Sequence, residues 1–337
     1  MSYSKYYIYK RQYSDDDGVT WHDVYPAETE PGGEPIGTYD TLAECEESPG
    51  PTGGPLTVIA LEDDTWFNCS VNIYTEGYIN VTHNGAGQNL NNGDSASFKI
   101  NKNEKVYVSG GLHSLADAHG ALMEINCNKK YKIEGEYSSV LGMDKCLGNV
   151  FHDNNLVSAK DLIITEVCNC SYLFSNCTSL TEPPSLPATT LAGGCYVYMF
   201  DGCTALTTPP QLPATTLSDS CYAGMFFGCT SLTTAPELPA TTLAASCYRS
   251  MFHKCTSLVE MPILPATTLP LLCYNGMFYG CKNLNSITCL AESGIGGTTT
   301  SNFLVNVSPT GTFYKKAGVS WPTGDEGIPS GWTVVEV

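Results

Sequence analysis

The sequence predicts a mainly β protein with short helical turns, most of it built from one repeated unit. Three observations support this prediction. A 26-residue unit recurs about four and a half times between residues 173 and 284, most clearly over residues 238–263. The 337 residues include 32 glycines and 20 prolines, which is typical of turn-rich β and repeat structure. Short runs of alternating apolar and polar residues precede the repeats, as expected of half-buried strands.

Each copy of the unit carries the same apolar residues at the same positions. Two cysteine series and one methionine series keep the 26-residue step throughout. They are Cys177, Cys203, Cys229, Cys255 and Cys281; then Cys195, Cys221, Cys247 and Cys273; and Met199, Met225, Met251 and Met277, each followed by phenylalanine. Identical residues form columns when copies pack side by side, so we expect these columns to form the core.

Within one copy, apolar residues recur at intervals of four. Leu243, Cys247, Met251 and Cys255 follow this spacing, which predicts one apolar stripe on a short helix or helical turn. The segment after Cys255 carries two prolines, which a strand tolerates only at its ends, edges or bulges. Any strand in the unit is therefore short, about three or four residues around Leu258.

The motif Met-Phe-x-Gly-Cys-Thr-Ser-Leu, followed by Pro-x-Leu-Pro, resembles the BspA-like leucine-rich repeats of gut bacteria and their phages. The resemblance covers roughly residues 147–290, and the closing residues 311–337 are similar to the usual ending of those chains. It implies a curved, right-handed leucine-rich-repeat solenoid with a short parallel sheet, used for surface adhesion and without enzymatic activity. Two departures are Asn169, in place of the first cysteine of the opening copy, and Lys254, in place of the glycine before Cys255.

Composition divides the chain into four expected segments. They are an N-terminal hairpin or anchoring module (1–48), a small β-sandwich (49–112), a leucine-rich-repeat solenoid that includes a degenerate first repeat (113–292) and a C-terminal cap (293–337). The first boundary lies at a run rich in glycine and proline, residues 47–55.

The N-terminal module contains one sequence typical of a tight hairpin. Residues 14–21 match the Asp-box pattern Ser-x-Asp-x-Gly-x-Thr-Trp. We expect Asp16 to accept hydrogen bonds from turn amides, Gly18 to allow a positive φ, and Trp21 to pack underneath. Calcium binding by the run Asp15–Asp17 is the weaker alternative, because three adjacent side chains do not converge as ligands at alternate positions do.

The second segment has the pattern of several short strands. We expect strands at residues 56–61, 66–73, 78–82, 96–100 and 105–108, with turn residues between them. Five strands at this spacing predict a small β-sandwich. A spacer and a carbohydrate-type binding domain are the two roles open to it.

Charge and motifs exclude several classes of function. The net charge of −18 argues against nucleic acid as a partner, since phosphates need clustered lysine and arginine. No Gly-rich phosphate loop, His-Glu-x-x-His motif or nucleophile elbow occurs, so we expect no enzyme, no cofactor and no metal. The Cys-x7-Cys spacing in each copy is not a zinc spacing; buried thiols are expected, with disulfides as the main alternative.

Residues that differ between copies are expected to face solvent. The position after the conserved phenylalanine holds Ser175, Asp201, Phe227, His253 and Tyr279 in successive copies. The rings among them should lie about 5 Å apart, the spacing of neighbouring strands, which suits stacking on sugars or contact with a protein. The candidate ligand-binding residues are Asp201, Phe227, His253, Tyr279, Tyr198 and Arg249.

The opening residues lack an apolar export segment, and no run of 18 apolar residues predicts a membrane span. A bacterial surface adhesin needs an export signal, whereas a phage protein is released by lysis. We therefore expect an exposed phage virion protein of tail or head-fibre type, joined to other virion proteins through its N-terminal module and to a host glycan or protein through the repeats. A bacterial cell-surface or secreted adhesin is the alternative, and a homo-oligomer remains open.

Overall fold

The computed structural model describes residues 6–15, 18–24, 35–39, 54–71, 75–114, 123–136, 150–151, 154–164 and 170–337. The chain divides into two compact units, Met1–Thr52 and Gly53–Val337. Over the described ranges the protein is mainly β, and its helical segments are the short α2 (Gly297–Thr300) and η2 (Gly324–Glu326). The mainly β character predicted from the sequence is confirmed.

The first unit contains one antiparallel sheet of β1 (Tyr6–Asp15), β2 (Gly18–Val24) and β3 (Pro35–Tyr39), in the order β2-β1-β3. The hairpin expected around residues 14–21 is present, because Asp15 pairs with Gly18 and Gln12 pairs with Trp21. Asp16 lies outside the described residues, and so do the turn contacts predicted for it.

The second unit begins with two sheets that share one core. Their strands are β4 (Leu56–Ala60), β5 (Thr65–Val71), β6 (Thr75–His83), β7 (Ala86–Leu90), β8 (Ser95–Ile100), β9 (Lys105–Ser114), β10 (Met123–Cys127), β11 (Tyr131–Glu136) and β12 (Leu156–Ile163). One sheet has the order β10-β5-β8, and the other has the order β12-β11-β4-β9-β6-β7. The alternation along β5, with Phe67, Cys69 and Val71 buried, turns one face of the small sheet toward this core.

The five strands expected between residues 56 and 108 are all found, with shifted ends. The sequence pattern does not predict β7, because its residues Ala86–Asn89 are all exposed and show no alternation. The strands at 123–127 and 131–136 pair with β5 and β4, and residue 112 lies inside β9. Strand pairing therefore joins residues 123–136 to the sheets of the preceding segment.

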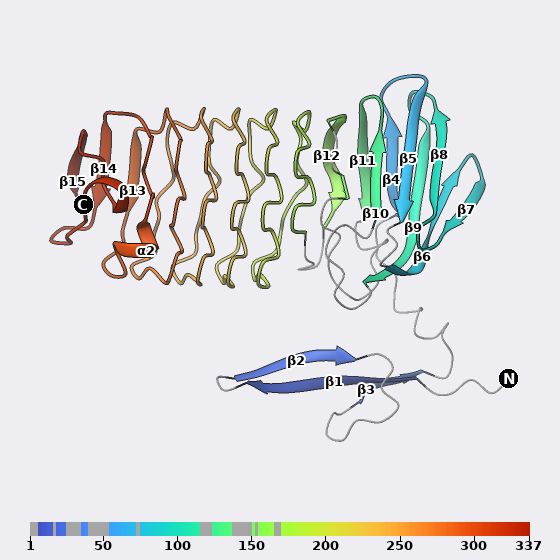
Figure 1. Cartoon of the computed structure of the whole chain (residues 1–337), viewed down its shortest axis with the longest axis horizontal. Coiled ribbons are helices and arrows are strands. Elements are labelled where there is room, and N and C mark those ends of the chain that lie inside the picture. The colour runs from blue at the N-terminus through green and yellow to red at the C-terminus, as the bar shows by residue number, and fades with distance from the viewer. Residues whose placement is uncertain are drawn as a thin grey trace. The chain divides into compact units, whose positions relative to one another are not determined.

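The repeats continue from β12, which pairs in parallel with β11 (Figure 1). Copies are joined by isolated parallel bridges rather than by strands: Thr190 with Thr216, Thr216 with Thr242, and Glu260 with Ser286. The short strand predicted around Leu258 is therefore wrong. The neighbouring prolines lack the N–H that a longer ladder needs, so pairing stops after one residue.

The helix or helical turn predicted over Leu243–Cys255 is also not found, because consecutive β-turns occupy this segment in every copy. Alternate backbone N–H groups have different partners. The N–H of Met199 bonds to the carbonyl of Tyr196 within the same turn, whereas the N–H of Phe200 bonds to the carbonyl of Met225 in the next copy. A positive φ recurs every four residues, and the interval of four therefore belongs to turns that stack on one another.

Stacked columns of identical residues fill the interior of the repeats. Phe174, Phe200, Phe226, Phe252 and Phe278 form one column, with ring centroids 5.6–5.7 Å apart. The predicted cysteine and methionine columns are buried as well. The thiol of Cys229 donates to the carbonyl of Phe200 at 3.0 Å, and Cys203, Cys255 and Cys281 repeat this contact. The cysteine column thus links neighbouring copies through hydrogen bonds as well as packing.

The C-terminal part adds one parallel sheet of β13 (Ser286–Cys289), β14 (Gly311–Lys315) and β15 (Trp332–Glu336), in that order (Figure 1). Phe303, Phe313, Trp321 and Trp332 are buried there. Phe303 stacks on Tyr274 of the last full copy, with ring centroids 5.5 Å apart. Among the described residues, no helix has the length and apolar character needed to span a bilayer.

The 13 cysteines of the described ranges are all buried. Burial raises the pKa of Cys273, Cys281 and Cys289 to about 12, and that of Cys221 to about 11, from the model-compound value of 9.0. As the pH rises, the unfolded chain therefore loses its thiol protons first. The contribution of the buried, protonated thiols to the stability of the folded protein is complete below about pH 8.5. It is lost progressively as the pH approaches 12.

We therefore expect the melting temperature to fall between about pH 8.5 and about pH 11. The thiols should also resist a thiol reagent in the native protein at about pH 8, and react fully in denaturant. Three cysteines, Cys45, Cys146 and Cys168, lie outside the described residues. At most three thiols per chain should therefore react in the native protein. Native labelling beyond three thiols, or a melting temperature that does not change with pH, would contradict it.

Candidate functional site

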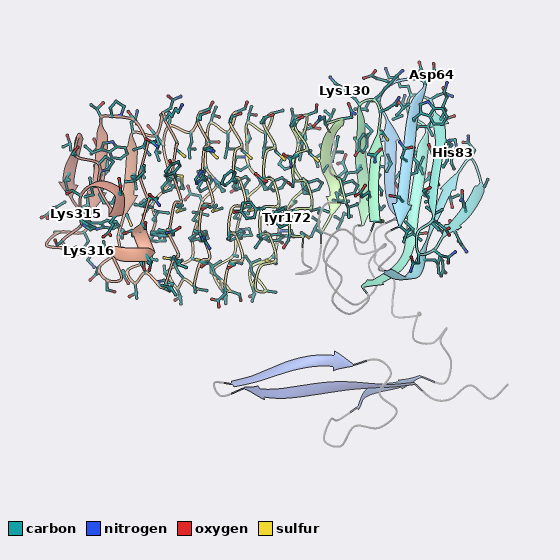
Figure 2. The ribbon with its side chains drawn as sticks, viewed as in Figure 1. Asp64, His83, Lys130, Tyr172, Lys315 and Lys316 are labelled. Atoms are coloured by element: carbon teal, nitrogen blue, oxygen red, sulfur yellow. The ribbon has the colours of Figure 1, made fainter. Side chains whose placement is uncertain are left out.

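Five aromatic side chains form one continuous row across the repeats. Ring centroids are 5.2 Å apart for Tyr172 and Tyr198, 5.9 Å for Tyr198 and Phe227, 4.4 Å for Phe227 and His253, and 4.6 Å for His253 and Tyr279. The last two distances agree with the spacing of about 5 Å predicted from the sequence. Figure 2 shows Tyr172 at the first of the stacked turns. We call these five residues the aromatic row.

The aromatic row changes from one sequence column to another at Gly224. Tyr172 and Tyr198 belong to the column that holds Gly224, whereas Phe227 lies three positions further along its copy. A Cβ at Gly224 would lie 2.3 Å from Cε1 of Tyr198, so the ring of Tyr198 occupies the space above this glycine. The missing side chain lets Tyr198 reach Phe227 and join the two columns.

A carboxyl group lies beside the first two rings. Asp201 is half-buried, and the hydroxyl of Ser175 donates to it at 3.5 Å. Burial raises the pKa of Asp201, while the hydrogen bond from Ser175 opposes this shift. Burial also raises the pKa of Tyr172, with smaller contributions from Tyr198 and Asp201. Asp201 therefore lies near Tyr172 and Tyr198, at the N-terminal end of the aromatic row.

A lysine lies near the middle of the row. The ammonium group of Lys254 is 5.9 Å from the ring centroid of Phe227, within the range of a cation–π contact. Burial lowers the pKa of His253, and the charge of Lys254 lowers it further. The Nδ1 atom of His253 is buried without a hydrogen-bond partner. The imidazole is therefore mainly neutral at neutral pH and packs as one more ring of the row.

The structure brings together five of the six predicted site residues: Asp201, Tyr198, Phe227, His253 and Tyr279. Arg249 is exposed, and no hydrogen bond, ion pair or ring contact joins it to the row within the described ranges. Tyr172 was missed by sequence reasoning. Tyr172 and Tyr198 are 26 residues apart and occupy the same position in successive copies, and this repetition could have identified Tyr172.

The stacking determines which parts of the rings a partner can touch. His253 has Phe227 on one face and Tyr279 on the other, with interplanar angles of 9° and 15°. Tyr198 stacks on Tyr172 with an interplanar angle of 16°, whereas its ring is tilted by 57° against Phe227. His253 therefore presents mainly its ring edge, which carries the positive part of the ring quadrupole and favours oxygen atoms of a partner.

The described residues hold no group of three or more His, Cys, Asp or Glu side chains placed to bind a metal ion. The stacked turns and the aromatic row define a mainly β repeat protein with a row of partly exposed rings. Comparisons with known protein families, with curated proteins and with solved structures give no match for this chain. Its function is therefore inferred from its own residues.

Proposed function

We propose that this chain is a non-enzymatic phage virion protein of tail or head-fibre type that adheres to a host surface. In this proposal, the repeats form a leucine-rich-repeat solenoid of the BspA-like kind, and the two preceding sheets form a small β-sandwich. The N-terminal module attaches the chain to other virion proteins. The repeats contact the host through the aromatic row.

One observation carries the proposal: the repeats keep their buried columns identical and vary where the aromatic row lies. Phe226 and Phe252 repeat without change in the core, whereas the next position holds Phe227 and then His253. A contiguous patch of partly exposed rings is uncommon on a protein that has no partner. Aromatic residues also dominate the binding energy of many interfaces, which supports the row as a contact surface.

The ring geometry favours a host protein over a glycan as the partner of this row. Sugars stack on the open faces of aromatic rings, and His253 has both faces covered by Phe227 and Tyr279. Ring edges, together with the carboxyl group of Asp201 and the ammonium of Lys254, match the mixed apolar and polar surface of a protein. No membrane insertion and no nucleic acid are part of this proposal.

The double variant Phe227→Ser/Tyr279→Ser tests the adhesion surface. We expect binding to host cells to fall about tenfold or more, because two rings of a central cluster are lost. The matched control is Val259→Ser/Ile263→Ser, which removes two exposed apolar side chains outside the row. Binding is measured with labelled protein on intact host cells, and melting curves verify folding. Equal binding by the test variant and the control would reject the role of the row.

Mass spectrometry of purified phage particles and of fractionated host cells tests the location. Peptides of this chain recovered in stoichiometric amounts from particles would support a virion component. Recovery only from the host surface or the medium would instead support the bacterial cell-surface or secreted adhesin. Sedimentation of the purified protein determines whether it is a homo-oligomer.

A further inference from the structure

A second surface with free aromatic rings lies on the six-stranded sheet, away from the repeats. Tyr78 on β6 and Tyr107 on β9 are 47% and 40% exposed. Their neighbours Ile79, Val106 and Val108 are buried, so both tyrosines point to the outer face of the sheet. Neither ring contacts another aromatic ring within the described residues, in contrast to the rings of the aromatic row.

The sheet register determines the separation of the two rings. Tyr107 pairs with Thr82, which follows Tyr78 by four residues on the same strand. The rings are therefore about 13 Å apart along the strand direction and lie on neighbouring strands. Figure 2 labels His83, the residue after Thr82, at the end of β6. The surface is long enough to contact more than one unit of an extended ligand.

Hydrogen-bonding side chains line the space beside the two rings. The hydroxyl of Thr82 donates to Oδ1 of Asn80, and Nδ2 of Asn80 donates to Oδ1 of Asn89 at 2.7 Å. Gly87 leaves room for this network, because a Cβ there would lie 3.1 Å from Nδ2 of Asn80. The network holds the amide of Asn80 in one orientation and leaves the Nδ2 group of Asn89 for a ligand.

The residues between the two rings have uncharged side chains. Asn80, Thr82, Asn89 and Ser109 are uncharged polar residues. Charged residues flank this group: Glu76 stands two positions before Tyr78 on β6, and Lys105 stands two positions before Tyr107 on β9. The charge of Lys105 is compensated by Glu134, with which it forms an ion pair at 2.6 Å. Lipid headgroups and acidic polymers need cationic side chains, and the core of a protein interface is usually more apolar. A neutral, hydroxyl-rich chain matches open ring faces beside oriented amides.

The other outer face of the two sheets lacks this combination. Its exposed aromatic residue is Trp66, and the ammonium group of Lys99 lies 5.7 Å from the Trp66 ring centroid. Lys99 also forms an ion pair with Asp64 at 3.5 Å. The Trp66 ring is thus engaged by a charged group, which makes it the matched control for exposed aromatic area.

We infer that the outer face of the six-stranded sheet, centred on Tyr78, Asn80 and Tyr107, binds a neutral polysaccharide. The two rings stack on sugar units, and Asn80 and Asn89 bond to the hydroxyl groups between them. This site is separate from the aromatic row and does not depend on the adhesion proposed for it. The protein would then have two binding surfaces of different chemistry, one for protein and one for glycan.

Affinity electrophoresis of the full chain tests this inference, with a soluble neutral β-glucan, a soluble neutral α-mannan and an acidic polysaccharide as probes. The wild-type protein should be retarded by at least one neutral probe and not by the acidic one. Tyr78→Ala/Tyr107→Ala should weaken that retardation about tenfold or more, whereas Tyr78→Phe/Tyr107→Phe should keep most of it. Trp66→Ala and Phe227→Ser/Tyr279→Ser should leave it unchanged.

Several results would overturn the inference. They are wild-type mobility unaffected by both neutral probes, equal retardation of the alanine double variant, and stronger retardation by the acidic probe. Sedimentation of the same variants tests whether a second copy of the chain, rather than a polysaccharide, covers this face. A change of oligomeric state in the alanine double variant would show that it does. The phenylalanine double variant keeps the test decisive if the alanine variant does not fold.

Discussion

A chain that lacks residues 300–337 should aggregate or fail to fold. Phe303 covers the end of two buried columns, with ring centroids 5.5 Å from Tyr274 and 5.4 Å from Phe278. Carbonyl groups of the removed segment also accept backbone hydrogen bonds from Gly276, Phe278 and Gly280 of the last copy. Deletion would leave these N–H groups without partners and expose the ends of the columns. Terminal caps are generally required for the solubility of repeat arrays.

Size-exclusion chromatography and thermal melting measure this effect. The matched control is a chain that lacks residues 1–52, which form a separate compact unit. We expect the control to remain soluble and to melt cooperatively, because its deletion removes no part of the repeats. A soluble chain ending at residue 299 with a cooperative transition would show that the C-terminal sheet is not a cap.

Two adjacent phenylalanines should respond very differently to alanine. Phe226 is fully buried in a column, with ring centroids 5.6 Å from both Phe200 and Phe252. Phe226→Ala should destabilise the protein by about 3–5 kcal/mol, through lost burial and the cavity that remains. Phe227 is partly exposed in the aromatic row, so Phe227→Ala should cost about 1 kcal/mol.

Denaturant unfolding of the two variants measures this difference, and host-cell binding provides the second readout. Phe226→Ala should lower the denaturant midpoint strongly. Phe227→Ala should leave the midpoint nearly unchanged and weaken binding. Similar midpoints for the two variants would contradict the assignment of one residue to the core and the other to a contact surface.

Much of this protein could be predicted from its sequence, because a repeated unit shows its own core. A residue that stays identical in every copy, such as Cys229 or Phe226, is identical because each copy packs against the next one in the same way. Strands such as β5 and β9 were predicted from alternation, since each has one face toward the core, whereas β7 shows no alternation and was not predicted. Four of the five residues of the aromatic row were predicted from their variation between copies, and Tyr172 was not.

Only the tertiary structure determined how these residues are joined. The interval of four suggested a helix, but the partners of alternate N–H groups lie in the next copy, which no local pattern reveals. The aromatic row crosses from one column to another because Gly224 leaves room for the ring of Tyr198. The side chains that pack around a ring likewise decide whether its face is exposed. His253 lies between two rings, whereas Tyr78 and Tyr107 stand alone on their sheet, because side chains distant in sequence determine what covers each ring.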